Sequence, residues 1–227
     1  MRDLFLLPDC ARAVRLFLDK ADNGPDEGLG LRLARSVDRA CVELNRDPST
    51  SGPKVVLEHL LAQGPIDADA LLTASRVSAA WAQHWAVRGV AAGSWAKVEG
   101  LSFTSVDGLM TVRAQLRVSH QGGQKGEHAV LYRVGRVPTS EREITAATAQ
   151  LAVVREAAPG VLARQCYLVD LSDWAAPADV AVAAYARLIA DASAREAKCD
   201  RAAPVPPINE TSACKRCRMQ GACGRLA

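Results

Sequence analysis

Three cysteines lie within ten residues of one another near the C-terminus of this 227-residue chain. Cys214 and Cys217 form a C-x2-C pair, and Cys223 follows after five further residues. Thiolates at this spacing can converge on one centre, either a tetrahedral zinc ion or an iron–sulfur cluster. Because both centres need a fourth ligand, the sequence predicts a metal site completed from elsewhere in the chain. The candidates are Cys10, Cys41, Cys166, Cys199 and the four histidines.

The cysteine content as a whole favours metal binding over disulfide bonds. The chain has seven cysteines, an odd number. Its N-terminus has a very short apolar run and an early acid, and so lacks the long apolar core of a secretory signal. We therefore expect the cytoplasm, where disulfides are rare. Cys41 and Cys166 stand in apolar patterns typical of small buried thiols. The histidines, which show no ligand spacing with one another, are expected to be structural or surface groups: His59, His84, His120 and His128.

Composition limits the class of protein further. With 49% hydrophobic residues, the chain is long and apolar enough for one large domain with its own core. Its apolar runs are interrupted by charges well before the roughly 20 residues that a membrane span needs, so no membrane partner is expected. The net charge of +3 is mild and does not by itself indicate a nucleic-acid binder.

The order of elements predicts an α/β domain. Apolar residues three and four apart predict helices over the first ninety residues, at Leu4–Lys20, Leu29–Leu44, Val55–Ala62 and Asp67–Val87. Strict alternation from Met110 to Val118 predicts a strand with one polar face, and flanking strands at Ser94–Ser105 and His128–Val134 complete a meander. A helix from Thr139 or Ser140 to Ala158, a strand at Leu162–Leu171 and a helix from Asp173 or Pro177 to Lys198 follow. The central sheet is therefore expected to be mixed.

These elements suggest three regions along the chain. A helical region, 1–92, carries the first cysteine, and 93–200 holds the sheet with its helices. The remaining segment, 201–227, combines a stiff proline linker, Ala202–Pro207, with the cysteine-rich metal-binding tail.

The cysteine pattern resembles that of RecB-like nucleases of the PD-(D/E)XK superfamily that carry an iron–sulfur cluster. That group includes CRISPR-associated exonucleases and the nuclease domains of bacterial recombination helicases, in which one N-terminal cysteine joins a C-terminal C-x2-C-x5-C. Cys10-Ala11-Arg12 is similar to the family's Cys-Pro-Arg, and Gly28–Val42 to its Gly-containing helix, although Arg32–Arg35 supply no histidine. The resemblance implies a restriction-endonuclease-like sheet and a 4Fe-4S cluster on Cys10, Cys214, Cys217 and Cys223. Zinc remains the chemical alternative, because it too accepts four thiolates.

The catalytic pattern of this family is incomplete. Its metal-binding aspartate and lysine would fall on Leu131 and Arg133, and its earlier acid near Gln115. Neither leucine nor glutamine replaces a carboxylate on magnesium, and arginine does not act as an acid–base group. Gln150 is retained, whereas Val154 stands where the family has a tyrosine. The sequence therefore predicts the fold without hydrolysis. The alternative is an active Mg²⁺- or Mn²⁺-dependent exonuclease with displaced acids: Glu99, Asp107, Glu127 or Asp170.

Basic residues suggest what such a fold still does. Arg113, Arg117, Lys125, Arg133 and Arg136 are expected to line the groove of the lost active site, and Lys215, Arg216 and Arg218 lie beside the metal ligands. Such residues hold phosphate backbones whether or not a bond is cut. The resemblance then implies a DNA- or RNA-binding subunit of a larger nucleoprotein complex, either a CRISPR-type ribonucleoprotein or a recombination and DNA-repair assembly. The rival hypothesis is a zinc-stabilised structural subunit that makes protein contacts only.

Overall fold

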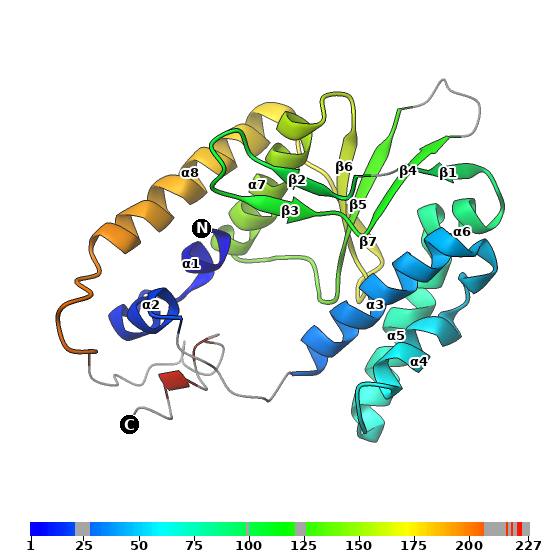
Figure 1. Cartoon of the computed structure of the whole chain (residues 1–227), viewed down its shortest axis with the longest axis horizontal. Coiled ribbons are helices and arrows are strands. Elements are labelled where there is room, and N and C mark those ends of the chain that lie inside the picture. Colours follow the sequence, from blue (N-terminus) through cyan, green and yellow to red (C-terminus); the bar gives the residue numbers. More distant parts are fainter. Residues whose placement is uncertain are drawn as a thin grey trace.

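The computed structural model describes residues 1–20, 28–98, 100–120, 126–206, 217, 219, 222 and 223. Over these residues a five-stranded sheet lies between two helical layers, with α7 and α8 on one side and α3 to α6 on the other (Figure 1). This arrangement confirms the predicted α/β class. No helix in the described part of the chain is both long and apolar enough to span a bilayer.

The sheet is mixed, as predicted. Its strands are β1 (Trp95–Lys97), β4 (Leu116–His120), β5 (His128–Arg133), β6 (Leu162–Tyr167) and β7 (Ser172–Trp174), in the spatial order β1-β4-β5-β6-β7. The first three form an antiparallel meander, β5 and β6 are parallel, and β7 returns antiparallel at the edge. A small hairpin of β2 (Ser102–Thr104) and β3 (Thr111–Arg113) stands apart from this sheet.

The helices follow the predicted order with two extra breaks. They are α1 (Arg2–Leu6), α2 (Ala11–Leu18), α3 (Leu29–Arg46), α4 (Pro53–Leu61), α5 (Ala68–Gln83), α6 (Trp85–Ala91), α7 (Glu141–Ala157) and α8 (Ala178–Ala197), with a short 3-10 turn at Pro48–Thr50. Ser140 caps α7 through a complete capping box with Glu143. The helix that connects β5 to β6 therefore begins at Ser140, as the sequence predicts.

Two predicted helices are each divided in the structure. The run from Leu4 to Lys20 breaks ahead of Pro8, where Leu7 is extended with ψ of 148°, because a proline disfavours helical backbone at the preceding residue. The run from Asp67 to Val87 breaks at His84, which is extended with ψ of 138°. No proline or glycine marks this second break, and the His84 side chain there hydrogen-bonds to Tyr132 and Asp173 of the sheet.

The alternating segment from residue 110 to 118 also changes partners midway. Its apolar residues Val112, Ala114, Leu116 and Val118 are buried, as the alternation predicts. However, the Ala114 N–H donates to Leu101 O at 2.8 Å, and the next N–H, of Gln115, donates to Val130 O at 3.1 Å. The segment therefore contributes β3 to the hairpin and β4 to the main sheet. Gln115 lies at the crossing point.

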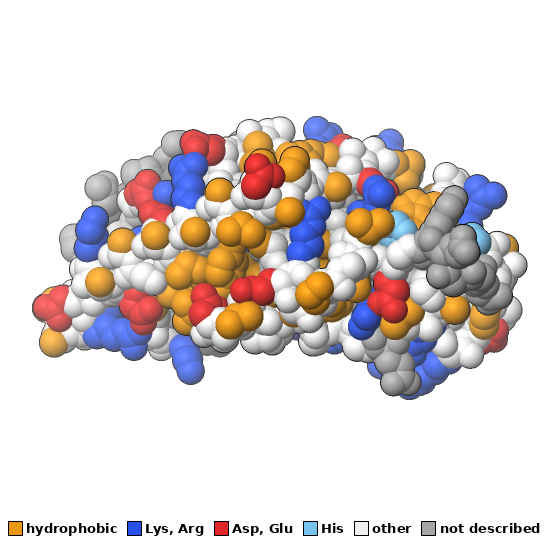
Figure 2. Space-filling model, turned by 90° about the horizontal axis from the view of Figure 1, so that it is seen from above, with side chains coloured by type: hydrophobic (Ala, Val, Ile, Leu, Met, Phe, Trp, Pro, Cys, Tyr) orange, Lys and Arg blue, Asp and Glu red, His pale blue; other side chains and the backbone are white. Residues whose placement is uncertain are grey.

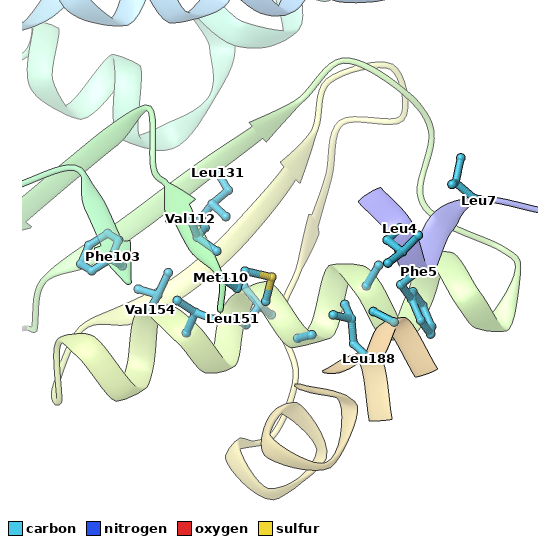
Figure 3. Packing of buried hydrophobic residues seen from close by; sticks show 14 of the residues in the cluster. Leu4, Phe5, Leu7, Phe103, Met110, Val112, Leu131, Leu151, Val154 and Leu188 are labelled. Atoms are coloured by element: carbon cyan, nitrogen blue, oxygen red, sulfur yellow. The ribbon is translucent and has the colours of Figure 1, made fainter. Parts of the chain in front are cut away.

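Two hydrophobic cores flank the sheet because β5 is buried on both faces. Ala129 and Leu131 join the core formed with α1, α2, α7, α8 and the hairpin, in which Leu131 points toward Val112 of the hairpin (Figure 3). Val130 and Tyr132 join the core under α3 to α6. Each fully buried leucine stabilises the fold by about 1.5–3 kcal/mol relative to an exposed one. The short N-terminal helices and α3 to α6 thus belong to different cores.

The surface seen from above mixes both signs of charge. Lys and Arg side chains alternate with Asp and Glu across this face, and hydrophobic side chains gather on its left half, the side that α8 occupies in Figure 1 (Figure 2).

Candidate functional site

A cavity of about 360 Å³ opens where α1, α3, the hairpin, β5 and α7 meet. Its lining includes the three residues that the family pattern singles out, Gln115, Arg133 and Gln150. Arg133 follows Leu131 by two positions on β5, so both side chains leave the strand on the same face. The structure also brings in two residues of the hairpin and α3, Arg113 and Asp38.

Asp38 is the carboxylate that α3 contributes to this cavity. The Gln115 side chain connects it to the sheet, because its Oε1 accepts from the Tyr132 N–H at 2.8 Å while its amide hydrogen-bonds to Asp38. Burial raises the pKa of Asp38 above its usual value. The Gln115 hydrogen bond and the charges of Arg113 and Arg133 oppose that rise without cancelling it.

Arg133 contributes a positive charge to the lining of the cavity. Burial lowers its pKa to about 10, which still leaves the guanidinium charged at neutral pH. It donates to Gln150 Oε1, and Gln165 Nε2 donates to the same oxygen at 3.2 Å. The Tyr167 hydroxyl donates to Gln165 Oε1 at 2.7 Å, which orients the amide. A chain of buried polar groups therefore fixes the guanidinium in the site.

The cavity is better suited to an anion than to a hard divalent cation. Asp38 and Asp3 are the carboxylates among its lining residues, and Asp3 is paired with Arg2 at 2.9 Å. Magnesium requires several oxygen ligands in near-octahedral geometry. Leu131, where the sequence resemblance predicts the loss of a metal-binding acid, is fully buried in the adjoining core. Arg2, Arg113 and Arg133 together exceed the two acids by one charge.

The alternative acids are engaged outside this cavity. Asp107 accepts hydrogen bonds from Ser105 and Tyr185, which lower its pKa. Glu127 accepts from Arg117 Nε at 3.0 Å, and Asp170 accepts from the Val137 N–H at 2.7 Å. None of these three lines the cavity. Glu99 lies outside the described residues.

The predicted basic residues separate into distinct places. Arg113 and Arg133 line the cavity, and Arg136 is exposed on the surface. Arg117 is ion-paired with Glu127, lies over the ring of Phe103 and borders a different cavity of about 620 Å³. The remaining residues lie outside the described part of the chain: Lys125, Lys215, Arg216 and Arg218.

Three of the four predicted metal ligands border one hydrophobic core. Cys10, Cys217 and Cys223 are each partly buried against the core of α1, α2, α7 and α8, and so is Cys199. Cys10 and Cys199 also line a shared cavity of about 330 Å³. Cys214 lies outside the described residues. The fold therefore brings the N-terminal cysteine to the same region as the tail.

Arg12 connects the region of Cys10 to the linker and the tail through hydrogen bonds. It lies two residues after Cys10, and its guanidinium donates to Pro206 O at 2.7 Å and to Cys223 O at 3.4 Å. Arg15, one turn further along α2, donates to Ala203 O at 2.8 Å. The start of α2 is thereby held against both the proline linker and the tail.

The two other cysteines have separate surroundings. Cys41 is buried, as predicted, and accepts a hydrogen bond from Trp81 Nε1 at 3.2 Å. Cys166 is also buried, and burial with the nearby charge of Asp173 raises its pKa to about 12. Among the described residues, its sulfur forms a group with donor atoms of His84 and Asp173, all within 4.8 Å of one another.

Sequence reasoning missed three of the residues gathered here: Asp38, His84 and Asp173. Asp38 stands about one turn after Arg32–Arg35, in the segment that resembles the family's Gly-containing helix but lacks its histidine. An acid on this helix was the signal that could have identified Asp38. His84 gave no signal, because its neighbours Cys166 and Asp173 are more than eighty positions away in the sequence.

Comparison with known proteins adds no identification. A scan of protein-family models and searches of curated proteins and of solved structures all give no match to this chain. Its function must therefore be argued from the residues of the sites themselves.

Proposed function

We propose that this protein binds DNA or RNA without hydrolysing it, through a nuclease-like fold whose former catalytic cavity now holds backbone phosphate. The observation that carries the proposal is the cavity of about 360 Å³ that Arg2, Arg113 and Arg133 line together with Gln115. The family resemblance expects an acid near Gln115 and a lysine at Arg133. A guanidinium binds phosphate oxygens through paired, charge-assisted hydrogen bonds. The residues that remain therefore suit binding and not metal-assisted cleavage.

The arrangement of charge supports this role. Arg113 is exposed and Arg133 is half-buried, so the cavity lining combines an accessible guanidinium with a more buried one. A buried guanidinium interacts more strongly with an anion than an exposed one does, because less water screens it. Asp38 opposes anion binding, and its raised pKa reduces that opposition.

The proposal includes an iron–sulfur cluster held by Cys10, Cys214, Cys217 and Cys223. Two facts support the ligand set: three of these thiols border one core, and Arg12 connects α2, which begins directly after Cys10, to the backbone of Cys223. Four thiolates in largely apolar surroundings suit a 4Fe-4S cluster, with zinc as the alternative. Bound there, the metal centre would staple the N-terminal helix to the tail. The larger nucleoprotein complex rests on the family resemblance alone.

Nucleic-acid binding can be tested by fluorescence anisotropy with labelled single-stranded DNA, duplex DNA and RNA at a series of salt concentrations. We expect affinity to fall with salt, and Arg113→Gln and Arg133→Gln each to reduce the slope of log K against log salt by about one. Arg76→Gln is the matched control, because Arg76 is exposed on α5 away from the cavity. Binding that is weak and indifferent to salt would instead favour the structural subunit.

Hydrolysis is the second candidate, and Asp38 is the specific reason to test it. Its carboxylate is an oxygen ligand that lies in the same cavity, with Asp3 as the second acid of the lining. The assay is degradation of labelled DNA with Mg²⁺ or Mn²⁺, comparing the protein with its Asp38→Asn variant. Our proposal expects no cleavage by either, and cleavage that depends on Asp38 would replace it.

A further inference from the structure

Side chains from three adjacent strands meet on the sheet face covered by α3 to α6, opposite the core that holds Leu131. Tyr132 on β5 pairs with Cys166 on β6, and Cys166 pairs with Asp173 on β7. Side chains at paired positions leave a sheet on the same face. Tyr132, Cys166 and Asp173 therefore form a row across adjacent strands. His84 reaches this row from the junction of α5 and α6.

The break between α5 and α6 presents His84 to the sheet. Its backbone is extended, and its ring is buried with 7% of its surface exposed. The ring lies edge-on to Tyr132, with centroids 5.1 Å apart. An uninterrupted helix would carry this ring past the strands, so the break and the contact belong together.

The donor atoms of His84, Cys166 and Asp173 converge on a common point. They lie within 4.8 Å of one another, and His84 Nε2 is 3.2 Å from Asp173 Oδ1. Zinc bonds of about 2.0–2.3 Å place tetrahedral donors about 3.3–3.8 Å apart. Small side-chain rotations are sufficient to reach that spacing.

His84 Nδ1 and Asp173 Oδ2 are already held by hydrogen bonds to neighbouring side chains. The Tyr132 hydroxyl hydrogen-bonds to His84 Nδ1 at 2.8 Å, and Trp85 Nε1 donates to Asp173 Oδ2 at 3.1 Å. These contacts leave His84 Nε2 and Asp173 Oδ1 facing each other at 3.2 Å, in the group that also contains the Cys166 sulfur. Metal-binding histidines and carboxylates are usually oriented by such second partners.

We propose that His84, Cys166 and Asp173 form a binding site for a zinc-class divalent ion, separate from the cysteine tail. One nitrogen, one thiolate sulfur and one carboxylate oxygen form a donor set that zinc and cobalt accept, whereas magnesium and calcium prefer oxygen throughout. The ion takes the place of the thiol proton of Cys166, which is released to solvent. His84 binds through Nε2 once its ring proton moves from Nε2 to Nδ1, where it is donated to the Tyr132 hydroxyl. The side chain of Asp173 is 29% exposed, which gives the ion a path of entry and leaves room for water as a fourth ligand. Bound there, the ion ties the edge strand β7 to the α5–α6 junction.

The site is tested by Co²⁺ titration of the full-length protein carrying Cys214→Ser, Cys217→Ser and Cys223→Ser, so that the tail cysteines contribute nothing. We expect one equivalent of Co²⁺ to bind with a thiolate-to-cobalt absorption band. Adding Cys166→Ala should abolish the band, and adding His84→Gln or Asp173→Asn should weaken binding at least tenfold. Cys41→Ala is the matched control, because it removes a buried thiol that is hydrogen-bonded to Trp81 instead.

Two outcomes would overturn the site: Co²⁺ failing to bind the tail variant, or the thiolate band surviving in its Cys166→Ala derivative. Thermal unfolding in chelator shows whether each variant folds. If Cys166→Ala does not fold, the partly exposed Asp173 decides, because unchanged affinity in Asp173→Asn would also exclude the site. Every measurement uses protein that lacks the three tail cysteines and contains no nucleic acid. A failure of this metal site therefore leaves the proposed function untouched.

Discussion

Arg12 and Cys223 are joined across almost the whole chain: the guanidinium donates to the Cys223 backbone oxygen at 3.4 Å over a separation of 211 residues. The same side chain donates to Pro206 O at 2.7 Å and is 6% exposed. A hydrogen bond from a charged donor contributes about 1.5–3 kcal/mol, and a buried carbonyl left without its donor adds a penalty. Arg12 should therefore hold the linker and the tail against α2.

We expect Arg12→Met to lower the free energy of unfolding by about 2–3 kcal/mol, because methionine keeps the apolar stem and removes both donors. Urea denaturation measures the change, and limited proteolysis at residues 201–206 reports whether the linker is released. Arg76→Met, exposed on α5, is the control and should stay within about 0.5 kcal/mol. An unchanged urea midpoint for Arg12→Met would mean that the tail is held by other contacts.

Gly89 on α6 is in tight contact with the indole of Trp95. A Cβ at Gly89 would lie 1.8 Å from Trp95 Cδ1, so Gly89→Ala must displace a ring that also packs against Trp85 and His128. We expect this overpacking to destabilise the protein by about 1–3 kcal/mol in thermal or urea unfolding. Gly30→Ala on α3 is the matched control. A Cβ there meets nothing within 4 Å, and the substitution should stabilise by up to about 1 kcal/mol. Equal effects at both glycines would contradict the role of Trp95.

Elements with strong local signals could be predicted from the sequence. The capping box at Ser140 starts α7, Pro177 precedes α8, and period-two alternation identifies the buried residues from Val112 to Val118. The break at Pro8 also had a local signal, because the residue before proline avoids helical backbone. The mixed sheet and the α/β class followed from the order of these elements.

Features that depend on distant neighbours could not be predicted. The break at His84 is matched to Tyr132 and Asp173, which lie 48 and 89 residues away. Asp38 enters the cavity only because α3 packs over the sheet beside Gln115. The change of pairing at Gln115 likewise depends on where Leu101 and Val130 stand. Such relationships are set by tertiary packing, which overrides local periodicity.

The identity of the fourth tail ligand is a prediction that substitution can decide. Cys10 and Cys199 border the same cavity of about 330 Å³, so position alone admits either. We expect Cys10→Ser to lose the iron and acid-labile sulfide of anaerobically purified protein and Cys199→Ser to keep both. Metal retained in Cys10→Ser but lost in Cys199→Ser would exchange their roles. Zinc without sulfide would keep the thiol ligands and exclude the cluster.

Asp38 should make the stability of the protein depend on pH in a direction opposite to that of an ion-paired carboxylate. Burial raises its folded pKa, whereas an unfolded aspartate has a pKa of about 3.9. The folded state therefore holds this proton more tightly, and the ionised carboxylate costs stability once the pH rises through the folded pKa. The Asp38→Asn side chain carries no charge and can still accept from Gln115, so the substitution avoids that cost.

We therefore expect Asp38→Asn to raise the urea midpoint at pH 7, with the gain disappearing below the unfolded pKa, where both side chains are neutral. Other carboxylates titrate equally in the two proteins and cancel in the difference. The same variant removes a negative charge beside Arg113 and Arg133, so nucleic-acid affinity should increase at neutral pH. A lower midpoint at pH 7 would mean that the arginines stabilise the ionised Asp38 by more than burial costs. The cavity would then be a preformed ion-pair network and a weaker candidate for phosphate.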